Sequence, residues 1–143
     1  MKNIERFIEI QKKEFNIALG EIKNGYKKSH WIWYIFPQLK GLGTSAMSEF
    51  YGIEDLEEAK EYYSNEYLKN NLLEISKSLL ELDNSIEKIL EYPDNLKLQS
   101  CMTLFEIVDS NEMVFKKVID KFYKGARDIK TLNLVKYMEK NHK

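Results

Sequence analysis

Apolar side chains recur every three or four residues along most of the chain, which is the period of an α-helix. One such stripe runs from Ile4 to Ile22, and another runs from Leu68 to Leu82. The chain has 2 prolines and 6 glycines, too few for a β architecture rich in turns. The sequence therefore predicts an all-α fold, in which residues 1–143 form a single compact domain of about seven to nine helices.

Capping residues and helix breakers divide this pattern into segments. Asn3 is expected to cap the first helix, and Gly25 is expected to end it in a left-handed conformation. The further predicted helices, with their caps or ends in parentheses, are 46–51 (Ser45, Gly52), 56–63 (Asp55), 66–82, 86–90 (Ser85, Pro93), one capped by Asp94, one from Asn111 to Gly125, and a last one that begins between Asp128 and Thr131.

The segment from Ser29 to Phe36 is rich in aromatic and β-branched residues, which favour strands. However, the chain shows no second strand to pair with it, and an isolated strand leaves its backbone groups without partners. We therefore predict a short, buried helix that Ser29 caps and that ends near Pro37.

The charges and the few metal-ligating residues argue against several classes of function. The 22 basic and 23 acidic side chains give a net charge of −1, without the basic excess typical of proteins that bind nucleic acid. The single cysteine, Cys101, and the single internal histidine, His30, make neither a disulfide nor a protein-only zinc site, so no metal or cofactor is expected.

No apolar run approaches the roughly 20 residues of a transmembrane helix, and no signal peptide is evident, so we expect a cytoplasmic protein.

The segment from Lys27 to Ser45 differs in composition from the rest of the chain, because it places hydroxyl, imidazole, indole and amide groups beside a glycine-flanked loop. Helix N-termini and lysines bind phosphate, and aromatic faces stack on bases, so a nucleotide would use all of these groups. Two glycines alone match neither a Rossmann nor a P-loop motif. The candidate ligand residues of this segment are Lys28, Ser29, His30, Trp33, Gln38, Lys40, Gly41, Gly43 and Ser45.

Structural explanations stand beside these functional ones. Core packing explains most of the aromatic run, since large aromatic side chains dominate protein interiors. His30 is a candidate general base, but a hydrogen-bonded structural role is the more common one for such a histidine. Asp94 and Asp128 stand where helix caps are expected, and Cys101 lies on an inward stripe as an inert buried thiol.

Two blocks of the sequence resemble a known family. The block from Lys28 to Ser45 contains Lys-Ser-His-Trp-x-Trp-x-Ile-Phe-Pro-Gln followed by Gly-Leu-Gly-x-Ser, and the block from Asp94 to Phe105 contains Leu-Lys-Leu-x-Ser-x-Met-Thr-Leu-Phe. Both are similar to the signature of the bacterial family called domain of unknown function 1810, whose members are sometimes labelled calpastatin. The resemblance implies an all-helical single domain and no established activity.

The second block adds Asp94, Lys97 and Thr103 to the candidate ligand residues, because the two polar blocks could face each other across a cleft. Lys97, Ser100 and Thr103 lie on neighbouring turns of one predicted helix. The chain departs from the family where a Gly and an Arg are usual, since Lys69 and Asn71 stand there.

Three functions therefore remain open. The leading hypothesis is a small-molecule binding protein that senses or sequesters a phosphate-containing nucleotide, such as an ADP-ribose derivative or a dinucleotide. The second is an enzyme that acts on such a ligand, with His30 as acid or base and Asp94 as an acidic partner. The third is a protein-interaction module whose aromatic block forms the partner surface.

Overall fold

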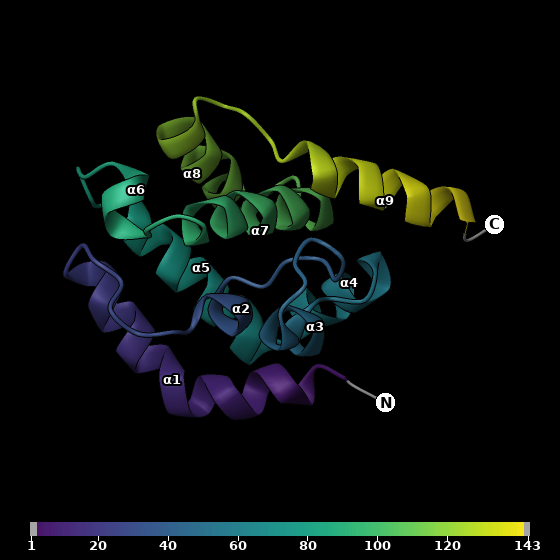
Figure 1. Cartoon of the computed structure of the whole chain (residues 1–143), viewed down its shortest axis with the longest axis horizontal. Coiled ribbons are helices and arrows are strands. Elements are labelled where there is room, and N and C mark those ends of the chain that lie inside the picture. The colour runs from purple at the N-terminus through teal and green to yellow at the C-terminus, as the bar shows by residue number, and fades with distance from the viewer. Residues whose placement is uncertain (1–2, 142–143) are drawn as a thin grey trace.

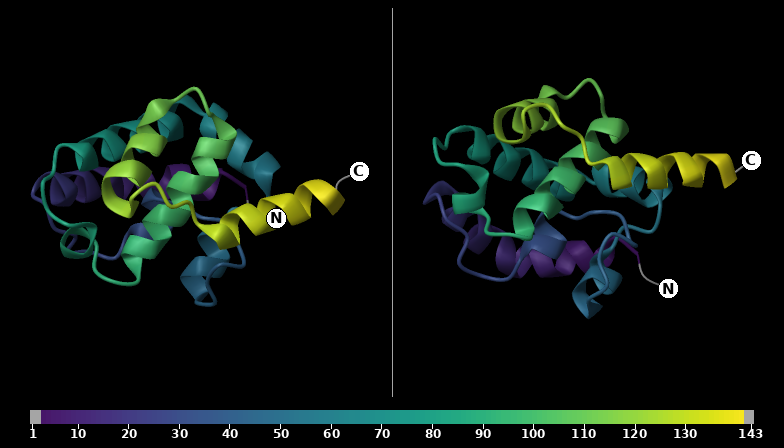
Figure 2. Two further views of the ribbon diagram at one scale, coloured as in Figure 1. Left: turned by 90° about the horizontal axis from the view of Figure 1, so that it is seen from above. Right: turned by 45° about the horizontal axis from the view of Figure 1, so that its top comes forward.

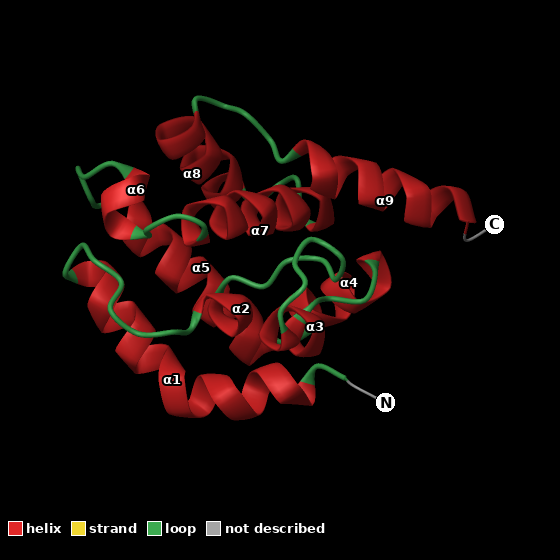
Figure 3. Cartoon of the chain, in the orientation of Figure 1, coloured by secondary structure: helices red, strands yellow, loops and turns green. Residues whose placement is uncertain are grey.

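The computed structural model describes residues 3–141, and within that range it contains nine helices and no strand (Figure 1, Figure 3). The all-α prediction is therefore confirmed. The helices are α1 (Glu5–Lys23), α2 (Ile32–Ile35), α3 (Ala46–Tyr51), α4 (Leu56–Ser64), α5 (Glu66–Leu80), α6 (Ile86–Ile89), α7 (Asp94–Val108), α8 (Met113–Tyr123) and α9 (Ile129–Asn141).

Helices α5 and α7 lie at the centre of the molecule. Helix α1 packs along α5, α8 packs against both α5 and α7, and α4 packs against the same two helices. The last helix, α9, contacts α7 and then extends away from the body of the fold (Figure 2). None of the helices formed by residues 3–141 is both long enough and apolar enough to cross a membrane.

The core is built from the apolar faces that the sequence pattern predicts. Phe105 of α7 lies among aromatic rings from α4 and α8, with its centroid 5.4 Å from Tyr62 and 6.2 Å from Phe115. These side chains are fully buried. Because burial of apolar surface is the main force that holds helices together, this cluster joins α4, α7 and α8 into one unit.

Several predicted helix ends are confirmed. Ser45 caps α3, since its hydroxyl accepts a hydrogen bond from the backbone N–H of Ser48 at 3.1 Å. Asp55 caps α4 in the same way, through the N–H of Glu58 at 2.9 Å. Gly25 follows α1 with φ +85°, the left-handed conformation that glycine adopts without a steric cost.

The predicted cap at Ser29 is wrong, because its side chain has another partner. The Ser29 hydroxyl donates to the Glu21 carboxylate at 2.6 Å, and Trp31 occupies the N-cap position of α2 instead. The short, buried helix itself is confirmed, and it ends at Ile35, just before the segment that contains Pro37. Of the two tryptophans, Trp31 is buried, whereas Trp33 is half-buried.

Two other predicted caps are also wrong. Asp94 is the first residue of α7 rather than its cap, because Pro93 occupies the N-cap position and the Asp94 carboxylate pairs with lysines. Asn111 does not cap α8, since the Glu112 side chain accepts from the N–H of Val114 at 3.2 Å. The helix predicted over 66–82 ends earlier, at Leu80.

The segment after α2 contains the one isolated β-bridge found among the described residues, a parallel pair between Leu39 and Ile53. The N–H of Lys40 donates to the carbonyl of Ile53 at 2.8 Å, and the N–H of Ile53 donates to the carbonyl of Gln38 at 2.9 Å. The bridge gives partners to the backbone N–H groups of Lys40 and Ile53. It also fixes the position of Gln38, whose carbonyl accepts one of the two hydrogen bonds.

Candidate functional site

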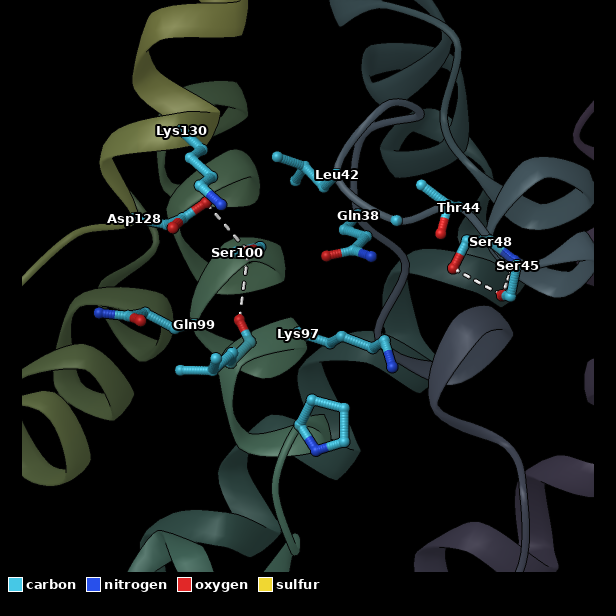
Figure 4. Close-up of a pocket in the computed structure, with 13 residues that line it drawn as sticks. Gln38, Leu42, Thr44, Ser45, Ser48, Lys97, Gln99, Ser100, Asp128 and Lys130 are labelled. Carbon is cyan, nitrogen blue, oxygen red and sulfur yellow. Dashed lines mark hydrogen bonds between the residues drawn. The ribbon is translucent and has the colours of Figure 1, made fainter.

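A pocket of about 470 Å³, which we call the main pocket, opens between the 38–48 segment and the helices α7 and α9 (Figure 4). Both blocks of the family-like sequence contribute to it. The residues that line it are Gln38, Leu42, Gly43, Thr44, Ser45, Ser48, Pro93, Leu96, Lys97, Gln99, Ser100, Asp128 and Lys130. Its volume lies within the range of about 300–1,000 Å³ that is typical of small-molecule sites.

The loop wall of the main pocket lies close against the Ser48 side chain of α3. A Cβ atom at Gly43 would lie 2.5 Å from the Ser48 hydroxyl oxygen, so this position requires glycine. The Ser45 hydroxyl also donates to the Ser48 hydroxyl at 3.0 Å. The loop therefore has a defined position, and the hydroxyls of Ser45 and Ser48 already hydrogen-bond each other.

The helical wall is fixed by Asp128, which lies at the start of α9. One carboxylate oxygen of Asp128 accepts from the Ser100 hydroxyl at 3.0 Å, from the Thr131 hydroxyl at 2.6 Å and from the Thr131 N–H at 3.1 Å. The Thr103 hydroxyl accepts from the N–H of Asp128 at 3.0 Å. Asp128 thus caps α9, as predicted, and it attaches α9 to α7.

Gln38 is a nearly buried polar side chain of this pocket. Its exposed fraction is only 8%, yet its side-chain amide takes part in none of the hydrogen bonds formed by residues 3–141. In Figure 4 the amide points into the space between Leu42 and the side chains of α7. The amide atoms reach the surface of the pocket, so water or a ligand there can supply hydrogen bonds that the described residues do not.

A cluster of charges lies beside the main pocket. Asp94 contacts two lysines, with Lys27 Nζ 2.9 Å from one carboxylate oxygen and Lys97 Nζ 3.5 Å from the other. Each ammonium group also lies over an indole ring, Lys27 at 5.2 Å from the centroid of Trp31 and Lys97 at 5.5 Å from that of Trp33. Two cations share one anion, so this largely buried cluster carries a formal charge of +1.

A second pocket of about 280 Å³, which we call the side pocket, lies on the other side of this cluster. Its lining residues are Tyr26, Lys27, Lys28, His30, Glu91, Tyr92, Pro93 and Asp94. The predicted ligand residues are therefore divided: Gln38, Gly43, Ser45 and Lys97 line the main pocket, whereas Lys28, His30 and Asp94 line the side pocket.

Five predicted ligand residues line neither of these two pockets. Thr103 is fully buried and donates to the carbonyl of Gln99, and Lys40 forms ion pairs with Glu49 and Glu54. Gly41 is exposed, with φ +101°. Trp33 lies under Lys97, and Ser29 is bound to Glu21.

The Glu21 carboxylate holds the 28–31 segment against α1. It accepts from the backbone N–H groups of Lys28 and Ser29, from the Ser29 hydroxyl and from the Trp31 indole N–H, at distances between 2.6 and 2.9 Å. Burial raises the pKa of Glu21, but these hydrogen bonds outweigh it and lower the pKa to about 2. The segment that carries Lys28 and His30 is thereby anchored by a carboxylate that is charged at neutral pH.

The groups that catalysis would need are not arranged as a dyad. His30 and Asp94 line the same side pocket, but Asp94 pairs with Lys27 and Lys97, and the His30 imidazole forms no hydrogen bond within residues 3–141. Burial raises the pKa of the Cys101 thiol well above its usual value, so this thiol is inert at neutral pH. The described part of the chain contains no group of three residues able to hold a metal ion.

Sequence reasoning missed part of the main pocket. Lys130 follows a predicted cap and Thr44 belongs to the loop, but neither belongs to a recognisable motif. Asn71 donates to the buried Gln11 side chain at 3.0 Å and lines neither pocket. Its side chain therefore belongs to the interior rather than to either pocket.

Comparison with known proteins gives a family and a structural relative. The family described as "protein of unknown function (DUF1810)" matches residues 1–135. The crystal structure of the conserved hypothetical protein Rv1873 from Mycobacterium tuberculosis is similar to this chain, with 36% sequence identity and a TM-score of 0.91, over 93% of this chain and 96% of that one. No curated protein gives a significant match.

Proposed function

We propose that this chain, which belongs to the DUF1810 family, is a small-molecule binding protein that holds a phosphate-containing nucleotide in the main pocket. Its role would be to sense or sequester that ligand in the cytoplasm of a bacterial cell. Neither the family description nor the description of the structural relative names an activity, so the proposal rests on the chemistry of the pocket.

The unpartnered amide of Gln38 is the observation that carries the proposal. The amide atoms are open to the pocket, where water or a ligand can supply the hydrogen bonds that the described residues do not. An amide presents one donor beside one acceptor, and nucleobase edges present the complementary pair. The apolar side chains of Leu42 and Leu96 line the same pocket and offer contact surface for a flat ring.

The phosphate would bind to lysines of the same pocket. Lys97 contacts Asp94 only at 3.5 Å and belongs to a cluster with an excess positive charge. Lys130 lines the pocket without an ion pair to any residue of 3–141, and the Thr44 hydroxyl has no hydrogen bond there either. Asp128 adds a negative charge, but three hydrogen bonds already compensate one of its oxygens. An anionic group is therefore expected near Lys97.

Binding without turnover fits the geometry better than catalysis. The general acid or base proposed from the sequence, His30, lies in the side pocket, where the acidic partner proposed with it, Asp94, is paired with Lys27 and Lys97. Incubation of the protein with a bound nucleotide, followed by chromatography of the products, separates the two. Release of a product at a rate that depends on His30 would contradict a purely binding function.

A thermal-shift screen against nucleoside monophosphates, ADP-ribose and dinucleotides tests the proposal. A ligand present at about one hundred times its dissociation constant stabilises the fold by about 2.7 kcal/mol, which is readily detected. The Lys97→Ala variant should weaken binding about tenfold or more, whereas Lys117→Ala, on an exposed position of α8, should bind like the parent protein. A panel without any shift would overturn the proposal.

A further inference from the structure

The side pocket has the residues of a nucleotide subsite but not the size of a complete one. Its volume of about 280 Å³ falls just below the range of about 300–1,000 Å³ for small-molecule sites. Lys28 and His30 line it, and neither side chain forms a hydrogen bond or ion pair within residues 3–141. A pocket of this kind suits one half of a longer ligand.

The side pocket also has aromatic surface that the fold does not use. Tyr92 has an exposed fraction of 76% and Tyr26 one of 43%, although large aromatic side chains normally bury most of their surface. The Tyr26 hydroxyl donates to Glu91 at 2.8 Å, which holds the ring at the edge of the pocket. Exposed aromatic rings next to cations are the usual components of a surface on which bases stack.

The two pockets are neighbours that share a lining residue and a charge cluster. Pro93 lines both of them, and Asp94, in the side pocket, contacts Lys97 of the main pocket at 3.5 Å and Lys27 of the side pocket at 2.9 Å. This charge cluster therefore contributes to both pockets, with Lys97 in the lining of the main pocket and with Lys27 and Asp94 in that of the side pocket. An anionic group that joins two ligand halves would meet a cation on each side.

We propose that the ligand is a dinucleotide, two nucleosides joined through a pyrophosphate, and that it occupies both pockets; this inference rests on the proposed function of the main pocket. One nucleotide lies in the main pocket against Gln38. The pyrophosphate passes Pro93 within reach of Lys97 and Lys28. The second base stacks on Tyr92.

Isothermal titration with AMP and with two dinucleotides that contain it, NAD⁺ and diadenosine diphosphate, tests this inference. At least one dinucleotide should bind about tenfold more tightly than AMP, because a second base and a second phosphate add contacts. In Tyr92→Ala and in Lys28→Ala this ratio of affinities should fall toward one. The matched controls Tyr137→Ala and Lys117→Ala, both exposed and outside the two pockets, should keep the ratio of the parent protein.

The possible results separate the two proposals. Equal affinities for AMP and the dinucleotides would overturn the dinucleotide inference and leave the main pocket as a mononucleotide site. A preference for a dinucleotide that survives both Tyr92→Ala and Lys28→Ala would also overturn it, because the side pocket would then not be responsible. Absence of binding by all three compounds would overturn the proposed function itself, and the inference with it.

Discussion

Arg6 and Gln38 are both polar side chains with an exposed fraction of 8%, but their surroundings are opposite. The guanidinium of Arg6 makes two hydrogen bonds of 3.0 Å to the Glu58 carboxylate, and it donates further to the backbone carbonyls of Asn3, Phe50 and Gly52. The amide of Gln38 has no protein partner within residues 3–141.

Equally buried polar side chains can therefore serve two purposes. A buried charge is tolerated only when it is paired and hydrogen-bonded, and the closed cluster around Arg6 meets that condition while it joins α1 to the 50–58 segment. Glu21 is a second closed cluster, with four hydrogen bonds from the 28–31 segment. Gln38, by contrast, is open toward the main pocket. We therefore expect substitutions in the fully hydrogen-bonded clusters of Arg6 and Glu21 to change the free energy of unfolding. Substitution of Gln38 should change ligand binding instead.

The Arg6→Ala substitution should have the largest effect on stability. It leaves the Glu58 carboxylate buried without its charged partner, which costs about 3–5 kcal/mol. Urea denaturation measures the free energy of unfolding. Arg127→Ala removes a more exposed pair with Glu106, whose atoms are 2.6 Å apart, and should cost about 1 kcal/mol or less. An equal loss of unfolding free energy in the two variants would contradict the greater importance of the buried Arg6–Glu58 pair.

The Glu21→Gln substitution should cost about 1–3 kcal/mol at neutral pH, since it removes hydrogen bonds to a charged group. Because folding lowers the pKa of Glu21 from 4.5 to about 2, its contribution is present above about pH 4.5 and is lost as the pH falls toward 2. The difference in unfolding free energy between parent and variant should therefore shrink in acid. A difference that stays constant from pH 7 to pH 2.5 would contradict this assignment.

The Asp128→Ala substitution should have a smaller effect, about 0.5–2 kcal/mol, because it removes the cap of α9. It also leaves the hydroxyls of Ser100 and Thr131 without their shared acceptor. Asp128→Asn, which keeps an acceptor oxygen, should recover most of the loss. Denaturation of the three proteins side by side checks this order, and a fully stable alanine variant would show that α9 does not depend on this cap.

The helices could be predicted from the sequence because local signals determine them. The three- and four-residue spacing of apolar residues and caps such as Ser45 and Asp55 act within one or two turns. The predictions at Ser29, Asp94 and Asn111 were wrong for one reason. Each of these residues is of a type that often caps helices, but other groups determine its role. Ser29 is bound to Glu21, Asp94 is paired with lysines, and Glu112 caps α8 in place of Asn111.

The candidate site could be predicted only in part. Both polar blocks do line one pocket, but the sequence could not show that Lys28 and His30 lie in a different pocket from Gln38. Nor could it show that Lys130, from the start of α9, joins the main pocket. These relations depend on the packing of distant segments, and Arg6 with Glu58, 52 positions apart, was missed for the same reason.

The Gln38→Leu variant shows whether Gln38 belongs to a ligand site, through its unfolding free energy and its nucleotide binding. The Gln38 amide makes no hydrogen bond within residues 3–141, so it should contribute little to the stability of the ligand-free protein. Its replacement by leucine should therefore lower the free energy of unfolding by less than about 1 kcal/mol, or raise it. The same variant should lose the thermal shift that a nucleotide produces in the parent protein. A variant that unfolds about 2 kcal/mol more easily, or that still binds nucleotide like the parent, would contradict the assignment of Gln38 to a ligand site.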